Sequence, residues 1–196
     1  MILIVMTVFL AYGMGSVCSA VIVSHLCHLP DPRLQGSRNP GTTNVLRIAG
    51  KKYAIIVLLA DMLKGLIPVV VAKMFHMSPT YLGYIGLAAV LGHVYPIFFN
   101  FKGGKGVATT LGVLFGLDWL LGLVVVITWL LVAVITRYSS LAAIIALSLS
   151  PVYAWFIIAA NPYLSVSLVL IVGCVLYQHL ENMQRLMQGK ESKIKI

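Results

Sequence analysis

The sequence VATTLGVLFGLDWLLGLVVVITWLLVAVIT, residues 107–136, decides the fold. It is thirty residues long and largely apolar, but Asp118 and the three glycines Gly112, Gly116 and Gly122 interrupt it. About 20 apolar residues are enough for a helix to cross a bilayer. The stretch is therefore either one long tilted helix or a short helix followed by a second, and the choice decides on which side of a membrane the C-terminus lies.

The rest of the chain has the same apolar character. Of its 196 residues 60% are hydrophobic and only 10% are charged, whereas a soluble domain carries about 25% charged residues. Residues 1–30 and 74–101 contain no charged side chain. The first of these runs lacks a basic start and is longer than the roughly 7–15-residue core of a signal peptide, so we expect it to remain as a first transmembrane helix. We expect an all-α integral membrane protein, with residues 1–196 forming a single domain.

The positions of the basic residues favour seven transmembrane helices over six. Apolar segments cover residues 2–27, 53–75, 81–99, 107–136, 141–159 and 163–180. Splitting the fourth segment, with the N-terminus outside and the C-terminus cytoplasmic, places twelve of the fourteen Lys and Arg residues on the cytoplasmic side, where such residues concentrate. These are Arg33, Arg38, Arg47, Lys51 and Lys52; Lys102 and Lys105; Arg137; and Arg185, Lys190, Lys193 and Lys195. With six spans, only seven of these twelve residues would lie on the cytoplasmic side, because Arg137 and the four tail residues would lie outside.

The cysteines and histidines do not predict a metal or cofactor site. Cys18, Cys27 and Cys174 form neither an even set nor a CxxC pair, so a disulfide framework is disfavoured. His25, Cys27 and His28 are close in sequence but lack the fourth ligand that a structural zinc site needs. The net charge of +9 lies at span ends, which indicates anionic lipid or phosphorylated substrates rather than nucleic acid.

The first loop, DPRLQGSRNPGTTNVLR over residues 31–47, has the composition of an anion site. Gly36 and Gly41 permit positive φ, so that neighbouring backbone N–H groups can converge on one anion. Arg47 adds a planar guanidinium suited to phosphate. Short polar side chains surround these residues: Ser37, Asn39, Thr42, Thr43 and Asn44. The alternative is a polar turn followed by a helix N-cap, but turn chemistry alone does not call for so many donors beside a guanidinium.

A second cluster, FKGGKGVATT over residues 101–110, overlaps the start of the apolar stretch at residues 107–136. Gly103, Gly104 and Gly106 form a turn without side chains between Lys102 and Lys105, where unpaired N–H groups and a helix dipole can bind an anion. No GxxxxGK[ST] motif is present, which disfavours a nucleotide triphosphatase. The alternative is a flexible basic turn.

Further polar residues lie after the last span and inside the second and third. As a helix, the tail places His179, Asn182 and Arg185 on one face; the same helix could also lie amphipathically at the membrane surface, and both can hold together. Asp61 and Lys64 are spaced to form an ion pair that positions helices. His93 either orients the glycine turn or caps a helix.

These motifs together resemble the bacterial acyl-phosphate:glycerol-3-phosphate acyltransferases. The resemblance runs from Gly15 to the tail with every motif in order, and its HLPDPR and SRNPG details are similar to the gammaproteobacterial branch. The residues that carry it are Asp31, Arg33, Gly36, Ser37, Asn39, Gly41, Thr43, Asn44 and Arg47; Asp61, Lys64 and Gly65; Gly92, His93, Pro96 and residues 101–109; Ser140 and Leu141; and His179, Glu181, Asn182, Arg185 and Leu186. The chain departs from the family where many members have Gly and it has Arg38, and at Cys18 in the first span.

The resemblance implies seven spans and transfer of an acyl chain from acyl phosphate to the 1-hydroxyl of glycerol 3-phosphate. The products are lysophosphatidate and phosphate, made at the cytoplasmic face of a bacterial inner membrane without a cofactor. The acyl phosphate would be handed over by the enzyme that forms it. The rival hypothesis is a small multi-span transporter of a phosphorylated anion, which would be expected to show related halves and broken helices at the midplane.

The resemblance also implies roles for individual residues. Ser37, Arg47, Lys105, His179 and Asn182 would hold glycerol 3-phosphate. The acyl phosphate would lie on the backbone of Gly41 and of the glycine turn, with Thr43 and Ser140. Gly36, Asn39, Asn44 and His93 complete the expected site. Direct transfer, with a substrate phosphate taking the hydroxyl proton, is favoured over an acyl-Ser37 intermediate because no histidine–acid pair lies near Ser37 in sequence. The HxxxxD motif of acyl-CoA-dependent acyltransferases is absent.

Overall fold

The computed structural model describes residues 2–158 and 161–194. Within these ranges the chain forms ten α-helices and one 3-10 helix and contains no strand, which confirms the all-α prediction. The predicted end of one span at Ala159, and the basic residue Lys195, lie outside the described residues. The helices are α1 (Ile2–Gly15), α2 (Ser19–Leu26), α3 (Thr42–Ala49), α4 (Lys51–Met74), α5 (Pro79–Val94), η1 (Ile97–Phe99), α6 (Val107–Leu117), α7 (Trp119–Thr136), α8 (Ser139–Ile157), α9 (Pro162–Gln178) and α10 (Leu180–Met187).

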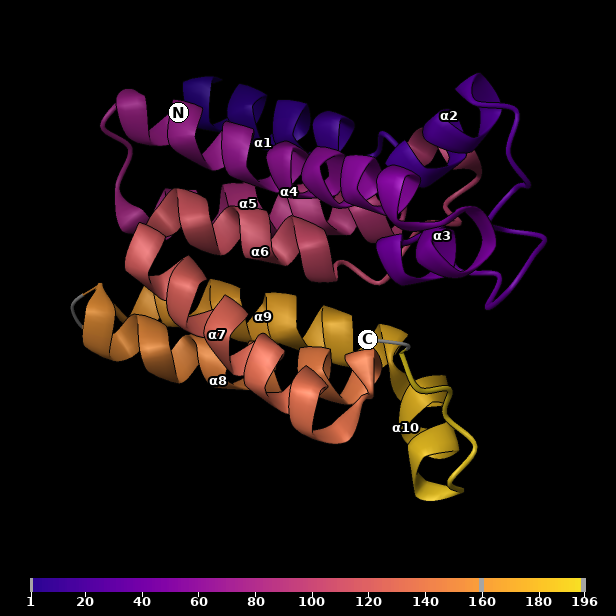
Figure 1. The fold of residues 1–196 in the computed structure, drawn as a ribbon. Coiled ribbons are helices and arrows are strands. Elements are labelled where there is room, and N and C mark those ends of the chain that lie inside the picture. The colour runs from indigo at the N-terminus through magenta and orange to yellow at the C-terminus, as the bar shows by residue number, and fades with distance from the viewer. Residues whose placement is uncertain (1, 159–160, 195–196) are drawn as a thin grey trace.

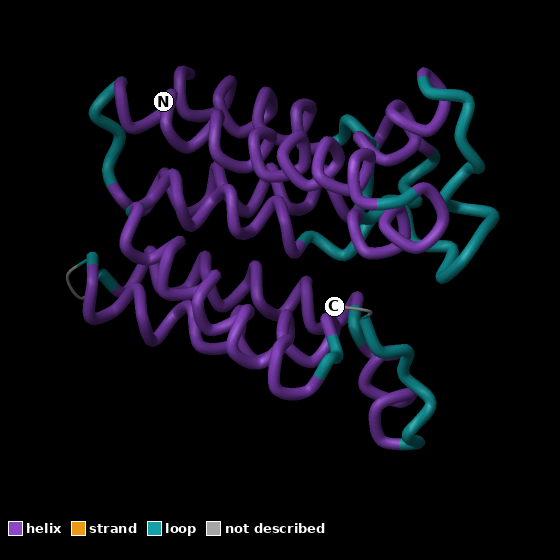
Figure 2. Tube along the Cα trace, in the orientation of Figure 1, coloured by secondary structure: helices purple, strands orange, loops and turns teal. Residues whose placement is uncertain are grey.

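The long helices form two groups that lie side by side. Helices α1, α4, α5 and α6 make the upper group in Figure 1, and α7, α8 and α9 make the lower one. The short helices α2, α3 and α10 all lie at one end of the bundle. The longer loops gather at this same end, whereas the connections before α5 and before α9 lie at the opposite end (Figure 2). We call the first of these ends the loop end.

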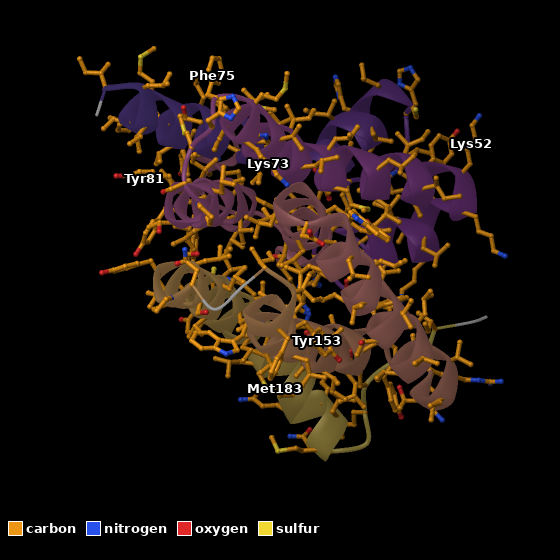
Figure 3. The ribbon with its side chains drawn as sticks, turned by 90° about the vertical axis from the view of Figure 1, so that its left-hand side faces the viewer. Lys52, Lys73, Phe75, Tyr81, Tyr153 and Met183 are labelled. Carbon is orange, nitrogen blue, oxygen red and sulfur yellow. The ribbon has the colours of Figure 1, made fainter. Side chains whose placement is uncertain are left out.

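Residues 107–136 form two helices rather than one, as the charge distribution predicted. The break falls at Asp118, whose carboxylate accepts hydrogen bonds from the backbone N–H groups of Leu120 and Leu121 at 2.8 and 3.2 Å. On the other side of the break, Lys73 from α4 donates to the carbonyl oxygen of Leu117 at 3.0 Å. Lys73 is labelled in Figure 3, which views the bundle from the end opposite the loops. One charged side chain thus starts α7 and another caps α6, which satisfies backbone groups that a break inside an apolar segment would leave unpaired.

The prediction of one continuous first helix over residues 2–27 is wrong. The helix ends at Gly15, and α2 continues from Ser19 at an angle of 44°. The carbonyl oxygen of Val17, released from the helix, accepts a hydrogen bond from Lys64 of α4 at 2.8 Å. Because a lysine from another helix satisfies this carbonyl, the chain can bend here without a proline.

Small residues bring the helices of the upper group into close contact. A Cβ atom built on Gly112 of α6 would overlap the backbone of Met62 in α4, and one on Gly65 would overlap the backbone of Thr109. Gly15 of α1 is equally close to the backbone of Ala89 in α5. Such contacts are typical of membrane helices, which gain little hydrophobic energy from one another and associate by close packing.

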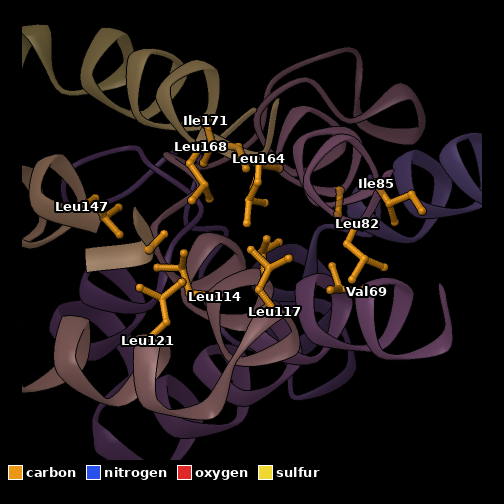
Figure 4. Close-up of a cluster of buried hydrophobic side chains, with 14 of the residues drawn as sticks. Val69, Leu82, Ile85, Leu114, Leu117, Leu121, Leu147, Leu164, Leu168 and Ile171 are labelled. Carbon is orange, nitrogen blue, oxygen red and sulfur yellow. The ribbon is translucent and has the colours of Figure 1, made fainter. Parts of the chain in front are cut away.

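The two groups share an apolar core, and apolar side chains also cover the outside. Figure 4 shows Leu114 and Leu117 of α6 facing Leu168 of α9 among other buried aliphatic residues. On the exterior, large side chains such as Phe156 and Ile135 are 80% and 79% exposed. Within the described part of the chain, four helices are long and apolar enough to cross a membrane, and up to six if each bent pair is counted as one span; α6 is a shorter apolar helix. A surface of this kind fits lipid rather than water.

Candidate functional site

The first loop is folded around the side chain of Asn44. This residue is 1% exposed, and its amide nitrogen donates to the carbonyl oxygens of Pro32 and Gln35 at 2.9 and 3.0 Å. Its amide oxygen accepts from the backbone N–H of Ser37 at 2.8 Å. Asn44 therefore holds the loop by three bonds to its backbone. Its role is to place Ser37, since its amide oxygen and nitrogen are already bonded within the chain.

The two residues that flank Ser37 have left-handed backbone conformations. Gly36 has φ of +61°, and a Cβ atom there would overlap the side chain of Asn44, so glycine is required on both counts. Arg38 has φ of +57°, which a non-glycine residue adopts only at some cost in energy. Arg38 stands where many members of the similar family have Gly. The side chain differs at this position, but the backbone keeps the left-handed conformation that glycine favours.

The glycine turn is held against the end of α5. The N–H groups of Gly103 and Gly104 donate to the carbonyl oxygens of Val94 and His93, both at 3.2 Å. A Cβ atom on Gly104 would overlap Nε2 of the His93 ring and lie 3.3 Å from the carbonyl oxygen of Pro40 in the first loop. The two clusters that the sequence singled out are thus adjacent. Because these two N–H groups are already bonded, an anion at this turn would be bound by the N–H groups that follow them, at the start of α6.

His93 connects this turn to a buried charged pair. Lys64 and Asp61 form the predicted ion pair at 2.8 Å, with side chains 6% and 2% exposed. Nδ1 of His93 lies 3.7 Å from the same Asp61 oxygen. Lys64 also bonds Val17, as described above, so the cluster joins α4, α5 and the bend after α1. Of the two roles considered for His93, its contact with Gly104 favours the orientation of the turn.

Lys105 of the glycine turn contacts the C-terminal helix. Its ammonium group donates a hydrogen bond to Oδ1 of Asn182 on α10. His179, at the joint between α9 and α10, is 3% exposed, and its Nδ1 lies 2.8 Å from the carbonyl oxygen of Val175. Since a carbonyl oxygen only accepts, Nδ1 carries the proton in a neutral ring and Nε2 is left as an acceptor. His179 thus immediately precedes α10, and Asn182 lies in the first turn of that helix.

The tail beyond α10 contributes a carboxylate that the sequence analysis did not consider. Glu191 accepts hydrogen bonds from the Ser140 hydroxyl at 2.8 Å, from Nδ2 of Asn182 at 2.7 Å and from Nε of Arg185 at 2.8 Å. Its side chain is only 6% exposed. A lone acidic residue between Lys190 and Lys193 in a basic tail gives no pattern by which it could have been found.

Arg47 is connected to the same segment. Its Nη2 donates to the hydroxyl of Ser192 at 2.7 Å, next to Glu191 in the chain. Arg47, Lys105, Ser140 and Asn182 thus belong to one network that joins α3, the glycine turn, α8 and α10. Other predicted residues have no side-chain bond to this network among the described residues: Ser37, Asn39, Gly41 and Thr43.

Burial and charge give the network its electrostatic character. Burial lowers the pKa of Lys105 to about 8, and the neighbouring Arg185 and Arg47 act in the same direction, against Glu191 and Glu181. Burial by itself would raise the pKa of Glu191, but the hydrogen bonds from Arg185, Asn182 and Ser140 outweigh it and hold that pKa below its usual value. At neutral pH the network therefore presents Arg47, Arg185 and Lys105 against one buried carboxylate.

Known proteins are similar to this chain in sequence and in fold. A family model described as Glycerol-3-phosphate acyltransferase matches residues 5–189. Proteins named glycerol-3-phosphate acyltransferase are 49% identical over 195 residues in Legionella pneumophila (strain Corby) and 50% identical over 184 residues in Methylococcus capsulatus. The first match covers 100% of this chain and 70% of its relative; the second covers 94% and 92%. These relatives are gammaproteobacterial, as the sequence details predicted.

Two crystal structures of PlsY (YgiH), an integral membrane glycerol 3-phosphate acyltransferase, have the same fold. The glycerol 3-phosphate form is 39% identical, with a TM-score of 0.92 over 98% of this chain and 96% of the other. The lysophosphatidic acid form is 38% identical, with a TM-score of 0.90 over 98% and 95%.

Proposed function

The chain belongs to the glycerol-3-phosphate acyltransferase family and is a membrane acyltransferase that forms lysophosphatidic acid, and from this premise we propose that its acyl donor is an acyl phosphate. Two adjacent anion sites are needed if both substrates carry a phosphate. The first loop and the glycine turn supply them, because Gly104 lies against Pro40 and His93. The sequence also lacks the HxxxxD motif that acyl-CoA-dependent enzymes carry.

The convergence of Arg47, Lys105 and Asn182 is the observation that carries our assignment of the glycerol 3-phosphate site. Two cations, Arg47 from α3 and Lys105 from the glycine turn, provide the charge that a phosphate dianion needs, and both are bonded to α10 or the tail that follows it. We assign Ser37 and His179 to the same substrate, with Gly36 and Asn44 placing Ser37. The backbone of Gly41, with Thr43, Asn39 and the glycine turn, is assigned to the acyl phosphate.

Ser140 takes a different part in this proposal from the one that the resemblance implies. Its hydroxyl proton is already donated to Glu191, so it has no second proton to give to a phosphate. We propose that Ser140 supports the site through Glu191.

The reaction proceeds by direct transfer in this proposal. The 1-hydroxyl oxygen of glycerol 3-phosphate attacks the acyl carbonyl carbon, the C–O bond to phosphate breaks, and inorganic phosphate leaves with the electron pair. A substrate phosphate takes the hydroxyl proton. The absence of any hydrogen bond between Ser37 Oγ and a histidine or carboxylate, over residues 2–158 and 161–194, supports direct transfer over an acyl-Ser37 intermediate. Positioning and charge neutralisation are sufficient because phosphate is a good leaving group.

The donor assay uses purified protein with glycerol 3-phosphate and either palmitoyl phosphate or palmitoyl-CoA. We expect equal amounts of lysophosphatidate and inorganic phosphate from palmitoyl phosphate, and no product from palmitoyl-CoA. Product from palmitoyl-CoA at a comparable rate would refute the proposed donor. Isolation of protein acylated at Ser37 would refute direct transfer.

We propose further that the single domain of residues 1–196 has seven spans, with α1, α4, α5, α6, α7, α8 and α9 each crossing a bacterial inner membrane. The site then faces the cytoplasm, where acyl phosphate is handed over by the enzyme that forms it. The gathering of the basic loops at the loop end supports this orientation.

Cys27 offers a native probe of orientation because it is exposed at the loop end, whereas Cys18 is buried. A membrane-impermeant maleimide should label Cys27 in inverted membrane vesicles but not in intact spheroplasts. Labelling in intact spheroplasts would show the opposite orientation. Cys27→Ser protein is the matched control for labelling of Cys174.

A further inference from the structure

The tail after α10 turns back across the loop end of the bundle. Gly189 has φ of +67°, and the N–H of Lys190 bonds the carbonyl oxygen of Arg185 at 2.8 Å, so α10 stops and the chain reverses. The N–H of Ile194 then donates to the carbonyl oxygen of Arg137, just before α8, at 2.8 Å. The segment between these anchors, which includes Glu191, is thereby held against the network of the candidate site.

The hydrogen bonds and burial of Glu191 indicate that its carboxylate stays in place when a substrate binds. One carboxylate oxygen accepts from Ser140 and Asn182, the other accepts from Arg185, and the side chain is almost fully buried. Displacement of this carboxylate would break its three hydrogen bonds and leave Arg185 only the 3.5 Å contact with the exposed Glu181, which is unfavourable. A substrate phosphate arriving at the site is therefore not expected to displace it.

We propose that Glu191 is a positioning residue for acyl transfer, which fixes the direction of the Asn182 amide and thereby the place of Lys105. The amide nitrogen of Asn182 is bonded to Glu191, so its oxygen must point the other way, where it accepts from Lys105. Without the carboxylate the amide could rotate and present its nitrogen to the ammonium group, which would repel it. This inference rests on the proposed role of Lys105 in holding glycerol 3-phosphate.

The charge of Glu191 also acts on Lys105. Arg47 on α3 and Arg185 on α10 lower the pKa of this lysine, as does burial, whereas Glu191 in the tail and Glu181 on α10 raise it. His179 lies in the same cluster. Glu181 is exposed, with its side chain at 86%, and solvent screens its charge, so Glu191 is the more effective of the two carboxylates. Loss of Glu191 should therefore make Lys105 lose its proton at a lower pH.

The test compares Glu191→Gln with Glu181→Gln, the same chemical change at an exposed position on α10. For Glu191→Gln we expect the KM for glycerol 3-phosphate to rise about tenfold or more, the equivalent of one charge-assisted hydrogen bond. We also expect the alkaline limb of kcat/KM to move by roughly half a pH unit or more to lower pH. Glu181→Gln should change KM by less than about twofold.

Glu191→Asp adds a second arm, since it keeps the charge but shortens the side chain by one methylene. Its KM should rise while its alkaline limb stays at the wild-type pH, a separation that a purely structural role would not produce. An unchanged KM and pH profile in folded Glu191→Gln protein would overturn the proposal. A lowered KM would overturn it too, by showing that the carboxylate competes with substrate. If neither Glu191→Gln nor Glu191→Asp folds, the role of Glu191 is structural and the proposal is wrong.

The variant Lys105→Ala separates this inference from the proposed function. If Lys105→Ala leaves the KM for glycerol 3-phosphate unchanged, the assignment of Lys105 is wrong and the role of Glu191 falls with it. If Lys105→Ala raises KM but Glu191→Gln does not, only the role of Glu191 is wrong.

Discussion

Replacement of Asn44 by Ala should disable the site by releasing the first loop, although Asn44 is not expected to touch either substrate. The side chain holds the loop through three hydrogen bonds, to the backbone of Pro32, Gln35 and Ser37, and is almost fully buried. Alanine removes all three bonds, and its methyl group does not fill the space that the Asn44 amide occupies between α3 and the loop. The backbone N–H of Ser37 would then lose its hydrogen bond to the Asn44 side chain.

The size of the effect follows from these bonds. A buried side-chain hydrogen bond contributes about 1 kcal/mol net, so the ordered loop loses about 3 kcal/mol relative to disordered forms. If nothing else held the loop, its ordered fraction would fall roughly 150-fold, since 1.4 kcal/mol corresponds to a factor of ten. The ion pair between Asp31 and Arg33, at 2.6 Å, preserves part of the order. We therefore expect kcat/KM to fall by about 10- to 100-fold.

The assay is phosphate release from palmitoyl phosphate in detergent, with protein shown to be folded by its thermal unfolding curve. Gln35→Ala is the matched control, because only the carbonyl oxygen of Gln35 takes part and its side chain is exposed. It should retain at least about half of the wild-type activity. A folded Asn44→Ala protein with kcat/KM within threefold of wild type would refute the reasoning that Asn44 orders the loop.

Four further predictions concern other parts of the chain. The kcat/KM for glycerol 3-phosphate should be level between about pH 7, where the substrate phosphate is a dianion, and about pH 8, and it should fall above pH 8 because Lys105 binds phosphate only when protonated; if the fall occurs at the same pH in Lys105→Arg, the assignment to Lys105 is contradicted. Asp61→Leu should destabilise the protein by roughly 3–5 kcal/mol by leaving Lys64 buried and unpaired, and the double variant with Lys64→Met should recover at least half, as measured by chemical unfolding in detergent; equal losses in both would contradict it. Asp118→Ala should lower Tm by about 2–4 °C through loss of the α7 cap, whereas an unchanged Tm would show that the cap contributes nothing. Arg38→Gly should keep activity within about twofold, since the backbone there already has the conformation that glycine favours; a tenfold loss would show that the side chain itself matters.

Much of the architecture could be predicted because charge is rare in this chain and each charged residue is informative. The distribution of Lys and Arg indicated that residues 107–136 divide, and the structure places the division at Asp118, the only charged residue within them. The bend after Gly15 could not be predicted in the same way. It depends on Lys64, which is 47 residues away in sequence and bonds the released carbonyl of Val17 only once α1 and α4 are packed.

The candidate site, too, could be predicted only in part from the sequence. Glycine, hydroxyl and basic residues close together in sequence indicated two anion-binding loops, and these lie adjacent at Pro40 and Gly104. Their adjacency depends on tertiary contacts, as does the part of Glu191, which becomes important only because the tail folds back over Ser140 and Arg185. Local composition predicts which groups can bind an anion, but not which carboxylate will hold them in place.

The central claim is that Arg47 of α3 and Lys105 of the glycine turn hold the same phosphate of glycerol 3-phosphate. A double-mutant cycle on the KM for this substrate tests it most directly, with Arg47→Ala, Lys105→Ala and the double variant. If one phosphate is shared, each single change should raise KM about tenfold or more, and the double change should raise it by clearly less than the product, with a coupling of at least about 1 kcal/mol. Effects that simply multiply, or a KM that neither change alters, would contradict the account.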